Sequence, residues 1–197
     1  MAYNVYHVEY RLGLQDPLMP AGERFHNVLF VETDPNGDGR IFHVTGAIAD
    51  ANGMRFEEKM GKRPEDSNTY HQKHYLGQIP AGQYEAFIQL MQSVPAPPRQ
   101  RIFDPRAMRL VQCKPDGSLY QPGETVPPYM KCTEWVLERA IPALQQSGFL
   151  YPDGIPQEQP AAETQQTQED MSEWTWDESR QKYYYYNYAT QEYVWSD

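Results

Sequence analysis

The fold is decided by one hairpin: FHNVLFVE at residues 25–32, the turn DPNGDG at 34–39, and RIFHVTGAI at 40–48. The two outer segments are rich in β-branched and aromatic residues, which favour strands. The Pro-Asn-Gly-Asp-Gly run between them is typical of a tight turn. We therefore expect two neighbouring antiparallel strands in the first half of the chain.

Three further strands are expected on either side of this hairpin. Residues 3–11 alternate Tyr and Val with polar residues, which is the two-residue period of a strand. Residues 54–60 and 70–79 are two more strand segments. Together the five segments predict an antiparallel sheet.

Two helices are expected after the last of these strands. Between Pro80 and Val94 the apolar residues have the spacing of one helical face: Tyr84, Phe87, Ile88 and Met91. A second helix is predicted from about residue 129 or 131 to residue 146. Pro142 lies inside this second pattern, where its ring either kinks the helix or ends its first half. The Pro- and Gly-rich stretch of residues 99–128 is predicted to be irregular.

The composition of the chain changes sharply after residue 150. The run QEQPAAETQQTQED has almost no bulky apolar residue and cannot bury enough surface to offset its ordering entropy. We predict a head domain at 1–150, a flexible polar linker at 151–170 and a small module at 171–197. The fold class is α+β, with an antiparallel sheet and two main helices, plus a small three-stranded all-β module at the C-terminus.

Charge and composition exclude two classes of partner. The 197-residue chain has a formal net charge of -10, whereas a nucleic-acid binder needs clustered Lys and Arg. Residues 1–13 contain charged residues and do not resemble a signal peptide, and no apolar run is long enough to cross a bilayer. Cys113 and Cys132 are expected to be free thiols. We expect a cytoplasmic protein with no nucleic-acid or membrane partner.

One constellation in the head predicts nucleophilic chemistry. Cys132 lies at or just before the start of the second helix, where unpaired backbone amides and the helix dipole favour the thiolate. His26 lies on a predicted strand, and a strand histidine that faces such a cysteine is the core of papain-like catalysis. With His43 on the next strand and Trp135 after the cysteine, the order resembles the permuted papain-like proteins, relatives of NlpC-type hydrolases that include the lecithin:retinol acyltransferase group. The resemblance covers roughly residues 3–149, and it implies Cys132 as nucleophile, His26 as base and His43 as the orienting group.

The sequence departs from this group in two respects. Lys131 precedes the cysteine, where the group has Asn. If the turn centres on its Asn-Gly pair, His26 pairs near Ala47, so that His43 lies four residues away, about 13 Å along the strand. That distance is too long for a hydrogen bond unless a bulge shifts the register. The alternative is structural: Cys132 is then a buried helix cysteine, and His26 a satisfied histidine of the sheet.

Two patterns mimic metal sites. Residues 34–39 place oxygen ligands at alternate positions, as an EF-hand calcium loop does, but Thr45 stands where that loop requires a bidentate Glu. A hairpin turn is the interpretation we adopt. His71 and His74 point to opposite faces if they lie on a strand, which favours a solvated pair. The sequence therefore predicts no metal and no cofactor.

The C-terminal residues carry the most specific motif of the chain. Trp174 and Trp195 bracket the aromatic block YYYYN at 183–187, which is followed by Thr190. This pattern resembles the WW domain, a three-stranded antiparallel module that grips proline-rich peptides. The resemblance implies that Tyr184 and Trp195 clamp a proline. It also implies that three tyrosines set the specificity: Tyr186, Tyr188 and Tyr193.

The same resemblance assigns the opposite side of this small sheet. Tyr185 and Trp174 are expected to pack there, although Trp176 competes with Trp174 for the position. An exposed aromatic groove suits a polyproline helix, whose extended backbone has little entropy left to lose. The alternative is that the aromatic hairpin packs on the head domain.

The expected partners are therefore proline-rich peptides or proteins. The chain has two such segments of its own, VPAPPR at 94–99 and VPPY at 126–129. A flexible linker of about twenty residues spans ~25 Å on average, which allows docking in cis or in a homodimer. We predict an interaction protein whose WW-like tail binds proline-rich segments. The alternative is a papain-like cysteine hydrolase or acyltransferase with Cys132 as nucleophile and His26 as base.

Overall fold

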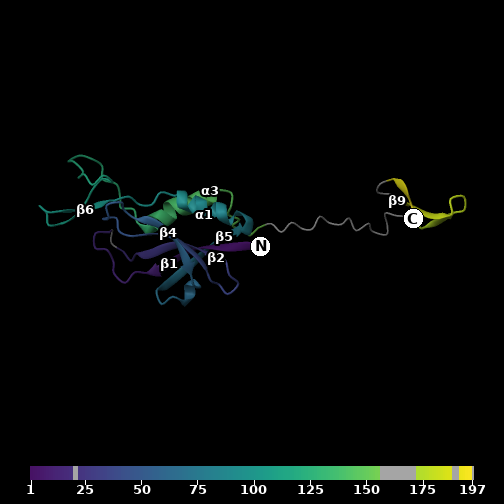
Figure 1. Ribbon diagram of the computed structural model, residues 1–197, viewed down its shortest axis with the longest axis horizontal. Coiled ribbons are helices and arrows are strands. Elements are labelled where there is room, and N and C mark those ends of the chain that lie inside the picture. The colour runs from purple at the N-terminus through teal and green to yellow at the C-terminus, as the bar shows by residue number, and fades with distance from the viewer. Residues whose placement is uncertain (20–21, 156–171, 188–190, 197) are drawn as a thin grey trace. The chain divides into compact units, whose positions relative to one another are not determined.

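The computed structural model describes residues 1–19, 22–155, 172–187 and 191–196, which belong to two compact units, Met1–Ile155 and Pro156–Asp197 (Figure 1). The strands of the first unit are β1 (Ala2–Arg11), β2 (Phe25–Glu32), β3 (Gly39–Thr45), β4 (Arg55–Gly61), β5 (Tyr70–Pro80), β6 (Arg101–Asp104) and β7 (Arg109–Gln112). Its helices are η1 (Pro64–Asp66), η2 (Ala81–Gln83), α1 (Tyr84–Ser93), α2 (Cys132–Trp135), η3 (Val136–Ala140) and α3 (Ile141–Gln146). The second unit contains β8 (Thr175–Asp177), β9 (Lys182–Asn187) and β10 (Glu192–Trp195).

The first unit is built on a five-stranded antiparallel sheet in the order β4-β3-β2-β1-β5. The β2–β3 hairpin and the α+β fold class are confirmed. In the turn, Asp34 and Asn36 accept hydrogen bonds from the backbone amides two residues further on. The carboxylate of Asp38 accepts from the Lys62 ammonium and the Arg63 amide. These oxygens are therefore used to close and anchor a hairpin turn.

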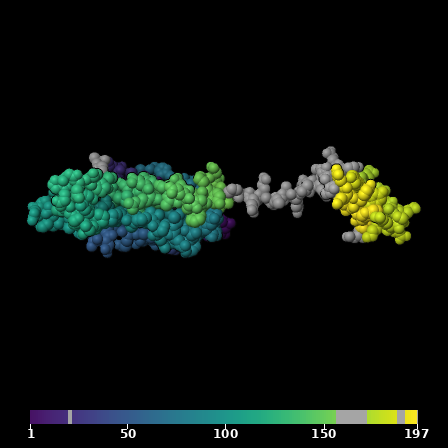
Figure 2. All heavy atoms as spheres, turned by 90° about the horizontal axis from the view of Figure 1, so that it is seen from above, coloured from purple at the N-terminus to yellow at the C-terminus, as the bar shows by residue number. Residues whose placement is uncertain are grey.

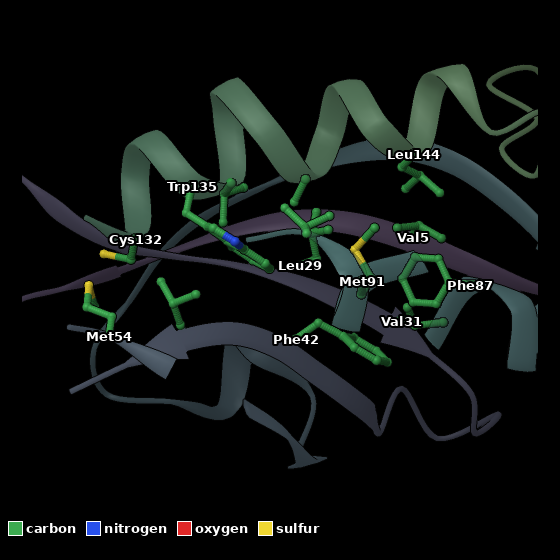
Figure 3. Close-up of a cluster of buried hydrophobic side chains, with 14 of the residues drawn as sticks. Val5, Leu29, Val31, Phe42, Met54, Phe87, Met91, Cys132, Trp135 and Leu144 are labelled. Carbon is green, nitrogen blue, oxygen red and sulfur yellow. The ribbon is translucent and has the colours of Figure 1, made fainter. Parts of the chain in front are cut away.

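α1 and α3 lie over one face of this sheet (Figure 1). α1 forms where the apolar spacing predicted it, and α2, η3 and α3 follow one another from Cys132 to Gln146. Figure 3 shows Trp135 and Leu144 pointing from this helical segment toward Leu29 and Phe42 of the sheet. All four side chains are fully buried, and burying an apolar side chain of this size stabilises the fold by about 1.5–3 kcal/mol. The outer side of the segment lies at the surface of the unit (Figure 2).

Pro142 is accommodated by a widened helical turn. Residues Val136–Ala140 form a π-helical turn, in which the Ile141 amide donates to the Val136 carbonyl, and Pro142 stands in the first turn of α3. The extra residue in the turn gives the proline ring room beside the preceding carbonyls, and the missing N–H is not needed there. The helix therefore continues past Pro142 to Gln146.

The segment that follows α1 is packed into the first unit. Val94 and Pro97 are buried, and the Met54 amide donates to the Pro97 carbonyl at 2.9 Å. Gly53 has a φ of +70°, and a Cβ on it would lie 2.3 Å from the Pro98 carbonyl carbon. Only glycine both adopts this backbone conformation without strain and lets the two chains approach so closely.

The stretch of residues 99–128, predicted to be irregular, contains a two-stranded antiparallel hairpin, β6–β7. Its four-residue strands are too short for a clear period in the sequence. After α3, Tyr151 pairs with Gln78 of β5 through two backbone hydrogen bonds. Residues 151–155 therefore belong to the first unit, and the predicted linker lies outside the described residues from 156 onward.

The second unit is a three-stranded antiparallel sheet in the order β10-β9-β8. Two hydrogen bonds outside the strands extend its pairing, from the Ser172 amide to the Tyr186 carbonyl and from the Ser196 amide to the Tyr183 carbonyl. This is the small antiparallel sheet predicted for the tail. Across the described parts of both units, no helix has the length and apolar character needed to span a membrane.

Candidate functional site

A row of hydrogen-bonded side chains crosses three strands of the first unit. His26 Nε2 on β2 lies 3.0 Å from His43 Nδ1 on β3, and His43 Nε2 lies 2.9 Å from Glu57 Oε2 on β4. An ionised carboxylate only accepts hydrogen bonds, so His43 donates from Nε2 and, as a neutral ring, accepts at Nδ1. His26 must then donate from Nε2. This order leaves Nδ1 of His26 with a free lone pair.

The expectation that His26 and His43 lie too far apart was wrong. β2 and β3 pair with Glu32 opposite Gly39 and Leu29 opposite Phe42, a register two residues away from that of a centred turn. The turn closes asymmetrically because the amides of residues 33 and 34 both donate to the carbonyl of residue 38. Continued toward His26, this register makes His43 its diagonal neighbour, within reach of two imidazole side chains.

Burial keeps both histidines of the row neutral. Burial, together with smaller effects of the nearby His43 and Lys59, lowers the pKa of His26 to about 4. Burial also lowers the pKa of His43, although the hydrogen bond to Glu57 opposes this shift. The same bond holds the pKa of the Glu57 carboxyl below its ordinary value. Near neutral pH, His26 is therefore an uncharged base whose orientation is fixed by a neutral His43 and an ionised Glu57.

Cys132 and His26 belong to opposite faces of the sheet. Cys132 is part of the core cluster beneath the helices, together with Leu29. His26 lies two residues before Val28 on β2 and so shares its face of the sheet, and Val28 belongs to the smaller cluster on the far face. The Cys132 sulfur lies 3.9 Å from the Phe25 carbonyl oxygen. The hydrogen bonds of the described residues do not join Cys132 to either histidine.

Both histidines nevertheless line the same cavity as Cys132. This cavity has a volume of about 250 Å³, and Met54 and Thr133 also line it. A second cavity of about 580 Å³ has His26 and His43 in its wall as well. The chain as a whole has a net charge of -10. This cavity nevertheless has four basic residues in its wall: Arg11, Lys59, Lys62 and Arg63.

A second polar cluster lies on β1 and β5, and the sequence did not identify it. His7 is buried on the face of β1 that carries Val5, and its Nε2 lies 2.6 Å from Asn27 Oδ1. Glu9 follows two residues later on the same face, and His74 is paired with His7 across the strands. The spacing of His7 and Glu9 was a visible signal in the sequence. The position of His74 depends on the register between β1 and β5, and the sequence carries no signal of that register.

The residues of the second unit that the sequence predicted to bind peptide, as far as the structure describes them, share one face of its sheet: Tyr184, Tyr186, Tyr193 and Trp195. Tyr184 stands opposite Trp195, with ring centroids 4.9 Å apart, and Tyr186 opposite Tyr193 at 5.0 Å. A third contact, between Tyr184 and Tyr193 at 5.6 Å, joins the two pairs. We call these four residues the aromatic face.

The opposite side of this sheet holds other aromatic rings of the described residues. Trp174 packs edge-on against Tyr185 with centroids 4.8 Å apart, as the sequence predicted. Trp176 contacts Tyr183 at the same centroid distance.

The Arg180 guanidinium lies 4.4 Å from the centre of the Trp195 ring of the aromatic face. Tyr188, the remaining residue predicted to bind peptide, lies outside the described residues.

Comparison with protein-family models yields a match. The model of a family of unknown function, DUF6540, matches residues 5–151. The match covers most of the first unit and none of the second. No curated protein and no solved structure shows a significant similarity to the chain.

Proposed function

Given that the chain belongs to DUF6540, a family of unknown function, we propose that it is an interaction protein whose C-terminal unit binds proline-rich segments. The aromatic face is the observation that carries this proposal. Its two cross-strand pairs form a continuous row of rings, and Tyr193 is 61% exposed. A row of partly open rings offers flat apolar surface to a ligand without a change of backbone.

Proline-rich peptides fit this face for a physical reason. A polyproline helix is already extended, so it loses little conformational entropy on binding, and its proline rings pack against aromatic side chains. The Arg180 guanidinium now lies over Trp195. An exposed contact between a cation and an aromatic ring contributes only about 0.5–1 kcal/mol. A proline that packs between Tyr184 and Trp195 can therefore displace it.

Of the two proline-rich segments within the chain, residues 126–129 are the better internal ligand. Val126 and the two prolines after it are exposed. In the other segment, residues 94–99, Val94 and Pro97 are buried and the Pro97 carbonyl accepts a backbone hydrogen bond. Binding of this second segment would require it to leave the core. We therefore restrict binding of the chain's own segments, in cis or between copies, to residues 126–129.

The test is a calorimetric titration of the full chain with a synthetic proline-rich peptide and with a copy whose prolines are alanines. We expect binding of the first peptide only. Tyr184→Ala and Trp195→Ala each remove one ring of the Tyr184–Trp195 pair. Each should weaken binding at least tenfold, about 1.4 kcal/mol. Trp176→Ala is the matched control, because this ring lies on the other side of the sheet.

Equal affinity for the two peptides would contradict the proposal. So would unchanged binding by Trp195→Ala in a protein whose NMR spectrum retains the dispersed signals of the second unit. A protein that binds the proline-rich peptide only after residues 126–129 are changed to Ala-Ala-Ala-Tyr would support docking within the chain.

A second function, a papain-like cysteine hydrolase or acyltransferase, is favoured by the cavity that Cys132 shares with His26 and His43. In this reaction the free Nδ1 of His26 would take the thiol proton, and the thiolate would attack the carbonyl carbon of an ester or amide. The bond from that carbon to the alcohol or amine would then break, the leaving group would take the proton from His26, and the acyl group would stay on the Cys132 sulfur as a thioester until water or an acceptor alcohol or amine removes it. The Cys132 side chain would first have to turn from the Phe25 carbonyl into the cavity.

Iodoacetamide labelling at neutral pH, mapped by mass spectrometry, tests this second function. An activated Cys132 should react faster in the native protein than after unfolding, and His26→Gln should remove that advantage. Cys113 is an internal reference, because burial raises the pKa of its thiol. Labelling of Cys132 that is slower in the native state would exclude the enzyme.

A further inference from the structure

Three ligand-type side chains converge on the helix-bearing face of β1 and β5: His7, Glu9 and His74. One potential ligand atom from each lies within 4.8 Å of the other two. The two imidazole rings stack with centroids 5.6 Å apart. None of these residues belongs to the row formed by His26, His43 and Glu57, which we call the histidine row, or to the aromatic face. Two imidazoles and one carboxylate that bind an ion from one side are a common ligand set for divalent transition ions.

The hydrogen bonds around His7 fix which of its nitrogens is available. The Asn27 amide nitrogen donates to the Phe25 carbonyl and to Thr133 Oγ1, each at 3.0 Å. The Asn27 side chain is therefore oriented with its oxygen toward His7, at 2.6 Å from Nε2. Because that oxygen only accepts, His7 Nε2 must carry a proton. In the neutral ring, Nδ1 then has a free lone pair.

Glu9 is oriented in a similar way by the neighbouring strand. The Gln72 amide nitrogen donates to Glu9 Oε2 at 2.6 Å, which leaves the other carboxylate oxygen available. Arg11, the next residue on this face, is turned toward the start of β5, where it donates to the Tyr70 carbonyl and contacts His71. Protein ligands of metal ions are typically held by such outer hydrogen bonds, which set the tautomer of a histidine and the orientation of a carboxylate.

We propose that His7, Glu9 and His74 form a binding site for one divalent transition ion of the zinc type. The burial of the three residues is graded: His7 is buried, Glu9 half-buried and His74 exposed. A bound ion would draw the ligand atoms to the ~2.0–2.2 Å at which zinc binds nitrogen and oxygen. Three protein ligands leave at least one coordination position for water or for an anionic group of a ligand.

The bulge in β1–β5 pairing is what assembles this site. Val5 stands opposite Gly77, but after the register shift Tyr6 stands opposite Tyr75 and His7 opposite His74. Without the shift, His7 would face Tyr75. β-Bulges often redirect a side chain beside a functional site, and here the bulge places the second imidazole on the same face as the first.

The experiment is a calorimetric titration of the metal-free full chain with zinc chloride. We expect one ion per chain. Glu9→Gln and His74→Ala each remove one ligand, and each should reduce the affinity by more than the roughly 10–100-fold that loss of an orienting group costs. Gln72→Ala, which removes such an orienting group, should produce the smaller effect. His71→Ala is the matched control, because it removes an imidazole three residues away on the same strand.

A second readout identifies the ligands. Cobalt substituted for zinc should show the weak visible bands of a nitrogen- and oxygen-ligated ion, without the strong sulfur charge-transfer band of a cysteine site. Unfolding curves recorded without metal should be the same for the wild type and His74→Ala, since His74 is exposed. The proposal fails if the wild type binds no zinc, if Glu9→Gln and His74→Ala bind as tightly as the wild type, or if His71→Ala alone loses the ion.

Discussion

His26 is a residue whose charge state is set by the fold. Its Nε2 donates to His43, and its pKa of about 4 results mainly from burial. The folded chain therefore resists protonation of a ring that would be half protonated near pH 6.5 in the unfolded chain. The same property that makes His26 a neutral base at physiological pH makes the fold sensitive to acid.

Stability should fall as the pH is lowered, because of His26. Between about pH 6.5 and about pH 4, the unfolded state binds a proton at this position that the folded state does not. The free energy of unfolding therefore falls as the pH falls through this range, by at most about 3 kcal/mol. Urea unfolding at a series of pH values measures it.

His26→Gln is the variant that isolates this effect. Glutamine can still donate a hydrogen bond to His43 Nδ1, but it does not titrate. Its unfolding free energy should vary less between pH 6.5 and pH 4 than that of the wild type. If the two curves run parallel across this range, His26 is not the residue responsible.

Trp135 is the largest fully buried side chain of the helical segment of residues 132–146. The ring is fully buried and contacts Phe56, with centroids 6.0 Å apart. Its indole N–H has no hydrogen-bond partner among the described residues. A buried donor without a partner costs about 1–3 kcal/mol, which the burial of the large ring outweighs.

Two substitutions at Trp135 should therefore differ strongly. Trp135→Ala should lower the free energy of unfolding by about 3–5 kcal/mol, because it leaves a large cavity. Trp135→Phe also removes ring volume, but it eliminates the unpaired N–H, so its cost should be about 1 kcal/mol or less. Chemical denaturation measures both, and a loss for Trp135→Phe as large as that for Trp135→Ala would contradict this account.

Elements were predicted from the sequence more accurately than the contacts between them. The five strands of the main sheet and both helices follow from local patterns, such as the alternation in residues 3–11 and the apolar spacing around Phe87. The pairing of His26 with His43 depends on two amides that share one carbonyl in a turn. The pairing of His7 with His74 depends on a bulge. Neither hydrogen-bonding detail has a period in the sequence, so the registers that assemble the histidine row and the proposed metal site were not predictable.

At the scale of the whole molecule, the first unit contains its own core. The buried residues of both its clusters, and the apolar residues packed against them, lie between Tyr3 and Leu150. The family match ends at residue 151. The aromatic face, which carries the proposed peptide binding, lies entirely in the second unit, and its residues were predicted from the resemblance of the tail to the WW domain.

A chain cut after Ile155 should fold. We expect cooperative thermal unfolding and the near-ultraviolet circular dichroism of a packed aromatic core, because no residue of either cluster is removed. The uncut chain, unfolded under the same conditions, is the control. A truncated chain with helical far-ultraviolet signal but no near-ultraviolet signal would show that the core needs the C-terminal residues.

The positions of the tryptophans give the chain two separate optical probes. Trp135 is enclosed in the first unit, while the other three tryptophans belong to the second, where Trp174 is 55% and Trp176 47% exposed. An enclosed indole emits at shorter wavelength than a hydrated one. The blue edge of the fluorescence spectrum therefore follows the first unit and the red edge the second, so that the effect of zinc or of a proline-rich peptide can be assigned to its unit in unlabelled protein.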